Sequence, residues 1–238
     1  MILKNLDNLD LKNFPVVIFG SGPAGISAAL EFERKNIKCL ILEAGSENYS
    51  KESQEFYKGE VIGDEFTDLS VSRLRQFGGT SGHWGGWSKP REEYSYQDWP
   101  INTNELDKYT NRTCEILEIK NLFRKSSLNN YFNQIEFKTS QVRFASKYKN
   151  HIKKSDKISL ILNTQLLYFV GKNKITNHAV CSSNGKIINI SSKYFILSCG
   201  GIENSRILLW TREKNKELIS SDLPIGNYWM NHPYILSG

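Results

Sequence analysis

A glycine-rich turn between two apolar strands constrains this chain more than any other feature of its sequence. Residues 15–19 (PVVIF) are fully apolar and lead directly into the glycines of residues 20–25. Residues 21–35 then carry alanines and a phenylalanine near one face at helical spacing, and a second apolar run, KCLIL, follows at 38–42. Strand, helix and strand in so short a span form a βαβ unit with parallel strands and a right-handed crossover. The sequence therefore predicts an α/β fold with a Rossmann-like, doubly wound sheet.

The turn itself reads Gly20-Ser-Gly22-Pro23-Ala24-Gly25, which is the spacing GxGxxG. Gly20 permits the tight turn, Gly22 lets a pyrophosphate approach the backbone, and Gly25 lets the helix pack closely on the sheet. The pyrophosphate would rest on free N–H groups at the positive end of the helix. We therefore expect these three glycines, with Pro23 and Ala24, to bind a dinucleotide.

An acidic residue completes this first motif. Glu43 ends the second strand, eighteen positions after Gly25. A carboxylate there accepts hydrogen bonds from both ribose hydroxyls and repels a 2′-phosphate, which disfavours NADP. The motif alone leaves NAD and FAD open, but its early position and the continuation Glu43-Ala44-Gly45 favour FAD.

A second glycine-rich segment, FGGTSGHWGG, occupies residues 77–86. Its glycines stand beside Thr80 and Ser81, a composition that suits close approach to a flat, phosphate-bearing ligand. Pro90-Arg91 follows, and then a W-P-I at 99–101, just before an amphipathic helix predicted at 103–119.

Together these segments resemble the glucose-methanol-choline (GMC) oxidoreductases. They are most similar to the sugar-oxidising branch, which contains pyranose oxidase and the large subunits of membrane-linked sugar and gluconate dehydrogenases. Two later segments add to the resemblance: FILSCGGIENSRILL at 195–209 and GNYWMNHP at 226–233. The similarity covers about residues 15–101 and 155–233.

The resemblance implies FAD as the cofactor and oxidation of a CH–OH group of a sugar or other alcohol by hydride transfer to flavin N5. It implies that Gly79, Thr80 and Ser81 contact the FAD and that the Leu166 backbone meets the adenine. Gly200 belongs to the second flavin-domain turn.

Two histidines have roles that only the resemblance suggests. His83 falls where pyranose oxidase carries a histidine covalently attached to the flavin 8-methyl carbon, so we hypothesise a covalent FAD at His83. The alternative is a histidine that packs or hydrogen-bonds beside a noncovalent flavin. His232 would lie in a loop near the cofactor, or would serve only the structure of that loop.

The rest of the chain predicts the second half of the sheet. Residues 46–72 are expected to be a loop with short helical pieces, and 120–154 give no assignment. From residue 158, strand-like runs follow one another, with Asn184-Gly185 as a type I′ hairpin signal. KYFILS then enters Gly200-Gly201, and a helix is expected from about 204 to 212. The expected organisation is a leader at 1–14, a discontinuous FAD-binding domain with a β-meander at 15–89 and 155–238, and a partial substrate or cap region inserted at 90–154.

Alcohol oxidation also requires a base for the hydroxyl proton. In the GMC family this base is a C-terminal histidine paired with another histidine or an asparagine, far beyond the glycine-rich loops. No candidate for that pair occurs in this chain, so we expect no catalytic residue here. We favour a truncated gene or fragment; a partner chain that supplies the C-terminal half and an inactive FAD-binding remnant are the alternatives. An NAD-dependent dehydrogenase is a further alternative, but it leaves residues 77–86 without a role.

Composition limits the partners. The formal charge is +6, with lysines spread along the chain, which indicates a solvated surface and no nucleic-acid partner; a small alcohol or sugar is the expected one. There is no run of eighteen apolar residues and no export signal in residues 1–13, so we expect a cytoplasmic protein without a transmembrane segment. The four cysteines, Cys39, Cys114, Cys181 and Cys199, are isolated, which argues against disulfides and structural metal.

Overall fold

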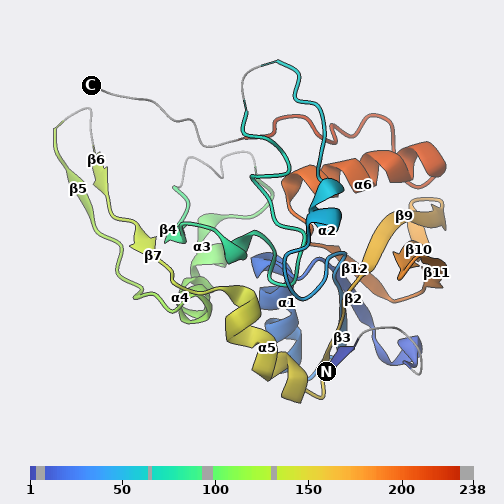
Figure 1. Ribbon diagram of the computed structural model, residues 1–238. Helices are drawn as coiled ribbons and strands as arrows, with labels where there is room; N and C mark the ends of the chain where they lie inside the picture. Colours follow the sequence, from blue (N-terminus) through green and yellow to red (C-terminus); the bar gives the residue numbers. More distant parts are fainter. Residues whose placement is uncertain (4–8, 64–65, 93–98, 130–132, 231–238) are drawn as a thin grey trace.

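A five-stranded parallel sheet lies at the centre of the computed structural model, which describes residues 1–3, 9–63, 66–92, 99–129 and 133–230 (Figure 1). Its strand order is β1-β8-β3-β2-β12. The strands are β1 (Ile2–Leu3), β2 (Val16–Phe19), β3 (Cys39–Leu42), β8 (Ile158–Ile161) and β12 (Tyr194–Leu197). Helix α1 (Pro23–Arg34) links β2 to its neighbour β3. The predicted α/β class with a Rossmann-like sheet is confirmed.

The order of the strands fixes where a ligand can bind. From β2 the chain crosses through α1 to β3 on one side, whereas β12 pairs with β2 on the other side. The winding of the sheet therefore reverses at β2. In open α/β sheets the crevice outside the carboxyl ends of the strands at such a reversal is the usual ligand site.

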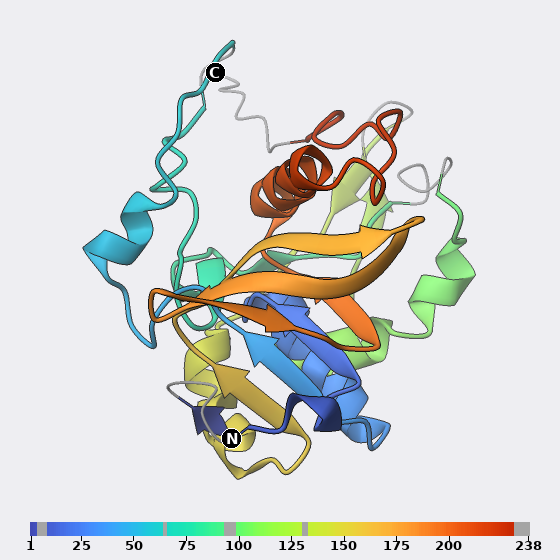
Figure 2. The ribbon, with the colours of Figure 1, turned by 90° about the vertical axis from the view of Figure 1, so that its right-hand side faces the viewer.

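The two faces of the sheet are covered differently. On one face α1 and α5 (Phe144–Lys154) pack on side chains such as Ile18 and Ile41, which are fully buried. On the other face lies the predicted antiparallel meander of β9 (Thr164–Lys172), β10 (Ile175–Ser183) and β11 (Lys186–Ile190). In Figure 2 the meander lies between the central sheet and α6 (Gly201–Lys214).

The hairpin between β10 and β11 forms where the sequence predicts it. Asn184 and Gly185 have φ angles of 47° and 80°, and Ser183 pairs with Lys186. Positive φ at both central residues is the type I′ geometry that matches the twist of the two strands.

Shorter elements surround this framework. The 46–72 segment contains one short helix, as expected. The shorter elements of the whole framework are η1 (Leu11–Asn13), α2 (Lys51–Glu55), η2 (Gly79–Gly82), β4 (Trp87–Ser88), β5 (Lys125–Ser127), β6 (Asn133–Ile135) and β7 (Lys138–Thr139). Within the segment expected as a leader, β1 pairs in parallel with β8 and so extends the sheet.

The prediction of one helix over residues 103–119 is wrong. The structure has two short helices, α3 (Thr103–Asp107) and α4 (Thr110–Leu117), and Tyr109, which was expected on the apolar stripe, is 58% exposed. The α4 sequence begins with threonine and asparagine, which favour helix ends over helix interiors. Its Arg112 bonds Glu31 of α1 at 2.7 Å, so a tertiary contact rather than continuity with α3 orients it.

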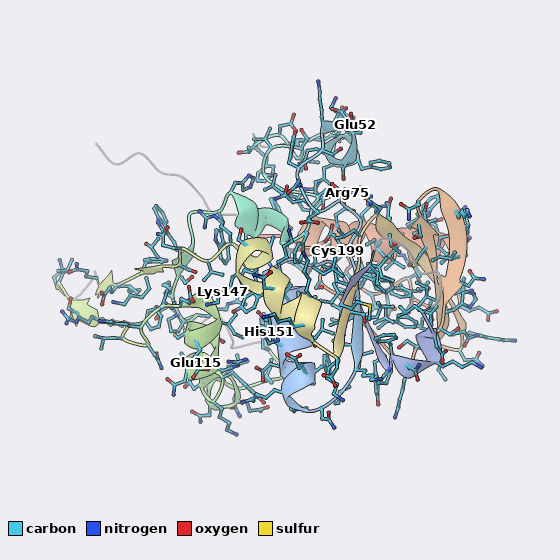
Figure 3. The ribbon with its side chains drawn as sticks, turned by 60° about the horizontal axis from the view of Figure 1, so that its bottom comes forward. Glu52, Arg75, Glu115, Lys147, His151 and Cys199 are labelled. Carbon is cyan, nitrogen blue, oxygen red and sulfur yellow. The ribbon has the colours of Figure 1, made fainter. Side chains whose placement is uncertain are left out.

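Helix α5 lies in the stretch that gave no assignment. Its residues Phe144, Tyr148 and Ile152 are four apart and all buried, so they form one apolar stripe on the helix. Lys147 and His151, labelled in Figure 3, lie on the same helix and contact Glu118 and Glu33 respectively. The predicted helix at 204–212 also begins earlier than expected, at Gly201.

Candidate dinucleotide-binding site

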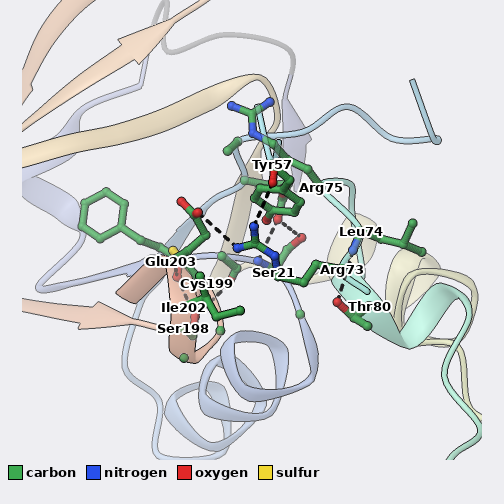
Figure 4. Close-up of a pocket in the computed structure, with 18 of the residues that line it drawn as sticks. Ser21, Tyr57, Arg73, Leu74, Arg75, Thr80, Ser198, Cys199, Ile202 and Glu203 are labelled. Atoms are coloured by element: carbon green, nitrogen blue, oxygen red, sulfur yellow. Dashed lines mark hydrogen bonds and ion pairs between the residues drawn. The ribbon is translucent and has the colours of Figure 1, made fainter. Parts of the chain in front are cut away.

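A cleft of about 530 Å³ opens at the carboxyl ends of β2, β3 and β12 (Figure 4). This volume is within the usual range for small-molecule sites. Ten of the residues expected at the site line it, and they come from both glycine-rich segments, the end of β3, the start of β9 and the turn after β12. They are Gly20, Gly22, Pro23, Ala24, Glu43, Ala44, Gly79, Thr80, Leu166 and Gly200, and Ser21 of the first turn lines the cleft as well.

The three glycines of the first turn have three different reasons to be glycine. Gly20 has φ +96°, and a Cβ there would lie 2.5 Å from the Ser198 carbonyl oxygen. A Cβ on Gly25 would lie 2.0 Å from the Gly20 carbonyl oxygen and 2.6 Å from Ser198 Oγ. A Cβ on Gly22 would meet no atom of the described chain within 4 Å. Gly20 and Gly25 thus permit the backbone packing of the fold, whereas Gly22 faces open space in the cleft.

Two helix N-termini lie at this cleft. Gly22 is the N-cap of α1, with Pro23 at the first helical position and no side-chain cap. Gly200 is the N-cap of α6, also without a side-chain cap. The first N–H groups of a helix have no partner within the helix and carry partial positive charge. The cleft is therefore suited to a diphosphate.

The carboxylate of Glu43 lies at the end of β3 and is 6% exposed. Its Oε2 accepts hydrogen bonds from the backbone N and the Oγ of Ser21, at 2.9 and 2.6 Å, and its Oε1 accepts one from Gly45 N at 2.8 Å. Three donors thus hold an acidic side chain in the wall of the cleft, where it can accept from ribose hydroxyls.

The second glycine segment packs directly on the first. A Cβ on Gly79 would lie 3.1 Å from Gly22 Cα, and Gly78 N donates to Ser21 Oγ at 3.2 Å. Thr80 lines the cleft and accepts from Leu74 N through its Oγ1 at 3.2 Å. Residues 57 positions apart in sequence (21 and 78) are thereby brought into contact.

Three of the expected site residues do not line the cleft. Gly25 lies in the first turn of α1, where it packs against the Gly20 carbonyl and Ser198. Ser81 is 1% exposed; its Oγ donates to the Gly78 carbonyl at 2.7 Å and accepts from Phe144 N at 3.1 Å, so it anchors the segment to α5. His83 is exposed and follows η2. His232 lies outside the described residues.

The start of β9 forms the side of the cleft where adenine is expected. Leu166 is 3% exposed and lines the cleft next to Thr164 and Gln165. The Thr164 amide donates to the Glu43 carbonyl oxygen at 2.8 Å, which holds β9 beside the end of β3. The expected adenine contact is thereby adjacent to the expected ribose contact.

Sequence reasoning missed the charged residues that cross the cleft. Arg73 Nη1 pairs with Glu203 Oε1 of α6 at 3.2 Å, and its guanidinium lies 4.1 Å from the centroid of the Tyr57 ring (Figure 4). Arg75 donates to Gln165 Oε1 at 3.0 Å. With Arg206, three guanidinium groups and the two carboxylates of Glu43 and Glu203 line the cleft. The only local signal was the S-R-L-R sequence just before the second glycine segment.

Burial affects the ionisation of the cleft residues. Desolvation, reinforced by the nearby Glu43 and Glu203 carboxylates, raises the pKa of the Cys199 thiol to about 12. Desolvation likewise raises the pKa of Tyr57 and lowers that of Arg75. At neutral pH Cys199 is thus a neutral thiol. All four cysteines are free.

No protein-family model and no curated protein matches the chain. Among solved structures, the fold is similar to that of pyridoxine 4-oxidase from Mesorbium loti, with a TM-score of 0.54 and 13% sequence identity. The match covers 83% of this chain and 51% of that one, so this chain spans about half the length of that protein. In the described part of the chain, no helix has the length and apolarity to cross a bilayer.

The glycine geometry predicts opposite consequences for two matched substitutions. Gly25→Ala forces its new methyl group into the Gly20 carbonyl and is expected to destabilise the fold by more than about 2 kcal/mol. Gly22→Ala places its methyl group in open space and is expected to cost about 1 kcal/mol or less, as an alanine N-cap does. Urea unfolding monitored by circular dichroism compares the two variants. Equal loss of stability would contradict the division of roles among the glycines.

Proposed function

We propose that this chain is the FAD-binding part of an oxidoreductase of the GMC type that acts on a CH–OH group of a sugar or other alcohol. One observation carries the proposal: both glycine-rich segments and Glu43 meet in a single cleft at the point where the sheet reverses. A dinucleotide motif alone would need only the first segment. The second segment supports a ligand that continues past the diphosphate, as FAD does.

The residues of the cleft fit the parts of FAD in order. Leu166 and Glu43 would hold the adenosine, and the first-turn amides of α1 after Gly22 would hold the diphosphate. Gly79 and Thr80 would lie against the flavin side. The open space at Gly22 is the cradle that a side chain would fill.

When bound, FAD supplies a hydride acceptor at its N5 atom for the alcohol carbon. The chain's own residues would bind and orient it, and the buried wall formed by Phe19, Leu42 and Leu166 would exclude water from its adenosine end. The proposal assigns no residue of this chain as the base for the alcohol proton. The fold similarity to a pyridoxine 4-oxidase, of which the match covers 51%, supports a reaction of the oxidase class shared with further residues. Residues 90–154 would be part of a substrate-side region.

Titration of the apoprotein with FAD tests the cofactor. We expect micromolar or tighter binding of FAD and much weaker binding of NADH, since NADH lacks the flavin that residues 77–86 would contact. Gly22→Ala should weaken FAD binding at least about tenfold, because the methyl group would occupy the space of the diphosphate. Quenching of flavin fluorescence and of protein fluorescence measures the two ligands. Preference for NADH over FAD by the folded wild-type protein would overturn the proposal.

The attachment of FAD is tested separately. We propose an 8α-histidyl link at His83, which is exposed and follows η2 outside the cleft lining. Its formation would remove one hydrogen from the 8-methyl carbon and one from the imidazole nitrogen and leave two electrons on the flavin, which dissolved oxygen would then reoxidise. After acid precipitation of the FAD-loaded protein, the yellow colour should stay in the pellet for wild type and pass to the supernatant for His83→Ala. Colour wholly in the supernatant for both would leave a noncovalent flavin.

Anaerobic incubation with aldoses and polyols tests the reaction. Since a positioned base contributes about 10²–10⁴-fold, we expect slow loss of the yellow flavin absorbance that accelerates as imidazole is added as an external base. The control is dithionite, which should bleach the flavin at once. Absence of bleaching by every sugar and polyol, with imidazole present, would identify an inactive FAD-binding remnant.

A further inference from the structure

The side chain of Ser21 lies where three loops of the cleft meet. It is completely buried, with 0% exposure. The GxGxxG spacing places no requirement on this position, so neither the tight turn nor the helix packing explains its hydroxyl. The hydroxyl instead contacts two segments that are distant in the sequence (Figure 4 labels Ser21).

The direction of its two hydrogen bonds is fixed by chemistry. Ser21 Oγ is 2.6 Å from Glu43 Oε2 and 3.2 Å from Gly78 N. A carboxylate oxygen can only accept and an amide can only donate, so the hydroxyl must donate to Glu43 and accept from Gly78. One hydroxyl therefore joins the first glycine turn, the end of β3 and the second glycine segment.

These bonds determine which oxygen of Glu43 remains available. Oε2 accepts from both the backbone N and the Oγ of Ser21, whereas Oε1 accepts only from Gly45 N. A carboxylate oxygen has about two acceptor sites. In the described part of the chain, the bonds to Ser21 thus fill Oε2 and leave the free acceptor site on Oε1. Without the hydroxyl, the carboxylate has one restraint fewer against rotation.

We propose that Ser21 is a positioning residue for ribose recognition: its hydroxyl orients the Glu43 carboxylate and aligns the second glycine segment with the first. This inference rests on the proposed function. The Ser21 hydroxyl is fully buried and acts through Glu43 and Gly78. Its contribution is therefore selective for ligands that carry ribose hydroxyls.

Calorimetric titration of the apoprotein with two probes, ADP and 2′,3′-dideoxy-ADP, tests the inference. In wild type ADP should bind at least about tenfold more tightly, because the dideoxy compound loses hydrogen bonds to a charged acceptor. In Ser21→Ala this preference should fall to about threefold or less, while the affinity for the dideoxy compound changes by less than about threefold. A general loss of packing would weaken both probes alike.

Ser140→Ala is the matched control. Ser140 is 1% exposed, and its Oγ donates to the Leu117 carbonyl at 2.7 Å and accepts from Val142 N at 3.2 Å. The burial and bonding pattern are those of Ser21, but Ser140 is not among the residues lining the cleft. Ser140→Ala should keep the wild-type preference for ADP.

A second variant, Ser21→Cys, retains most of the side-chain volume with a weaker donor, and it should lose the preference as Ser21→Ala does. A folded Ser21→Ala with the wild-type preference overturns the inference. Failure of both Ser21 variants to fold, while Ser140→Ala folds, also overturns it, because the hydroxyl would then serve the fold. Wild-type protein that binds neither FAD nor ADP refutes the proposed function instead.

Discussion

The close approach of three backbone segments at the end of β2 is the constraint on which the rest of this structure depends. Gly20 lies against Ser198 of the β12 loop, and Gly25 lies against the Gly20 carbonyl. Any side chain at position 20 or 25 would separate β2 from β12 or lift α1 from the sheet. Because the strands and α1 stay together, the N-termini of α1 and α6 open into one cleft beside Glu43. The positive ends of two helices in one cleft favour an anionic ligand.

The parts of the fold that could be predicted from the sequence are those encoded by neighbouring residues. The boundaries of β2, α1 and β3 follow from apolar runs and the glycine turn, and the hairpin follows from Asn184 and Gly185, which tolerate positive φ. The glycine and acidic positions of the cleft were predictable for the same reason: each has a local role in a turn or at a strand end, and the turn chemistry is visible in the sequence.

The remainder depends on contacts between distant residues. Arg73 and Glu203 are 130 positions apart, so no local pattern indicates that they pair across the cleft. Nor does the stretch around α4 show that Arg112 will bond Glu31 of α1, which separates α4 from α3. Helix α5 is an intermediate case. Its apolar stripe of Phe144, Tyr148 and Ile152 is present in the sequence, but five of the eleven helix residues are lysine or histidine. The helix is therefore recognised only from its packing on the sheet.

The glycines of the first motif fall into two groups: Gly20 and Gly25 are required by the backbone packing of the fold, and Gly22 is not. A sheet wound in this way needs Gly20 and Gly25 for its own backbone, whether or not it binds anything. Nothing in the described chain needs Gly22: its φ of −71° is open to any residue, and the space beside it is empty of protein atoms. Under the proposed function FAD explains this glycine, because its diphosphate would occupy the space beside Gly22. Gly79 differs from Gly22: its φ is +54°, and a Cβ there would lie 3.1 Å from Gly22 Cα, so the close approach of the second segment to the first itself requires a glycine. That approach is what brings both glycine-rich segments to one cleft.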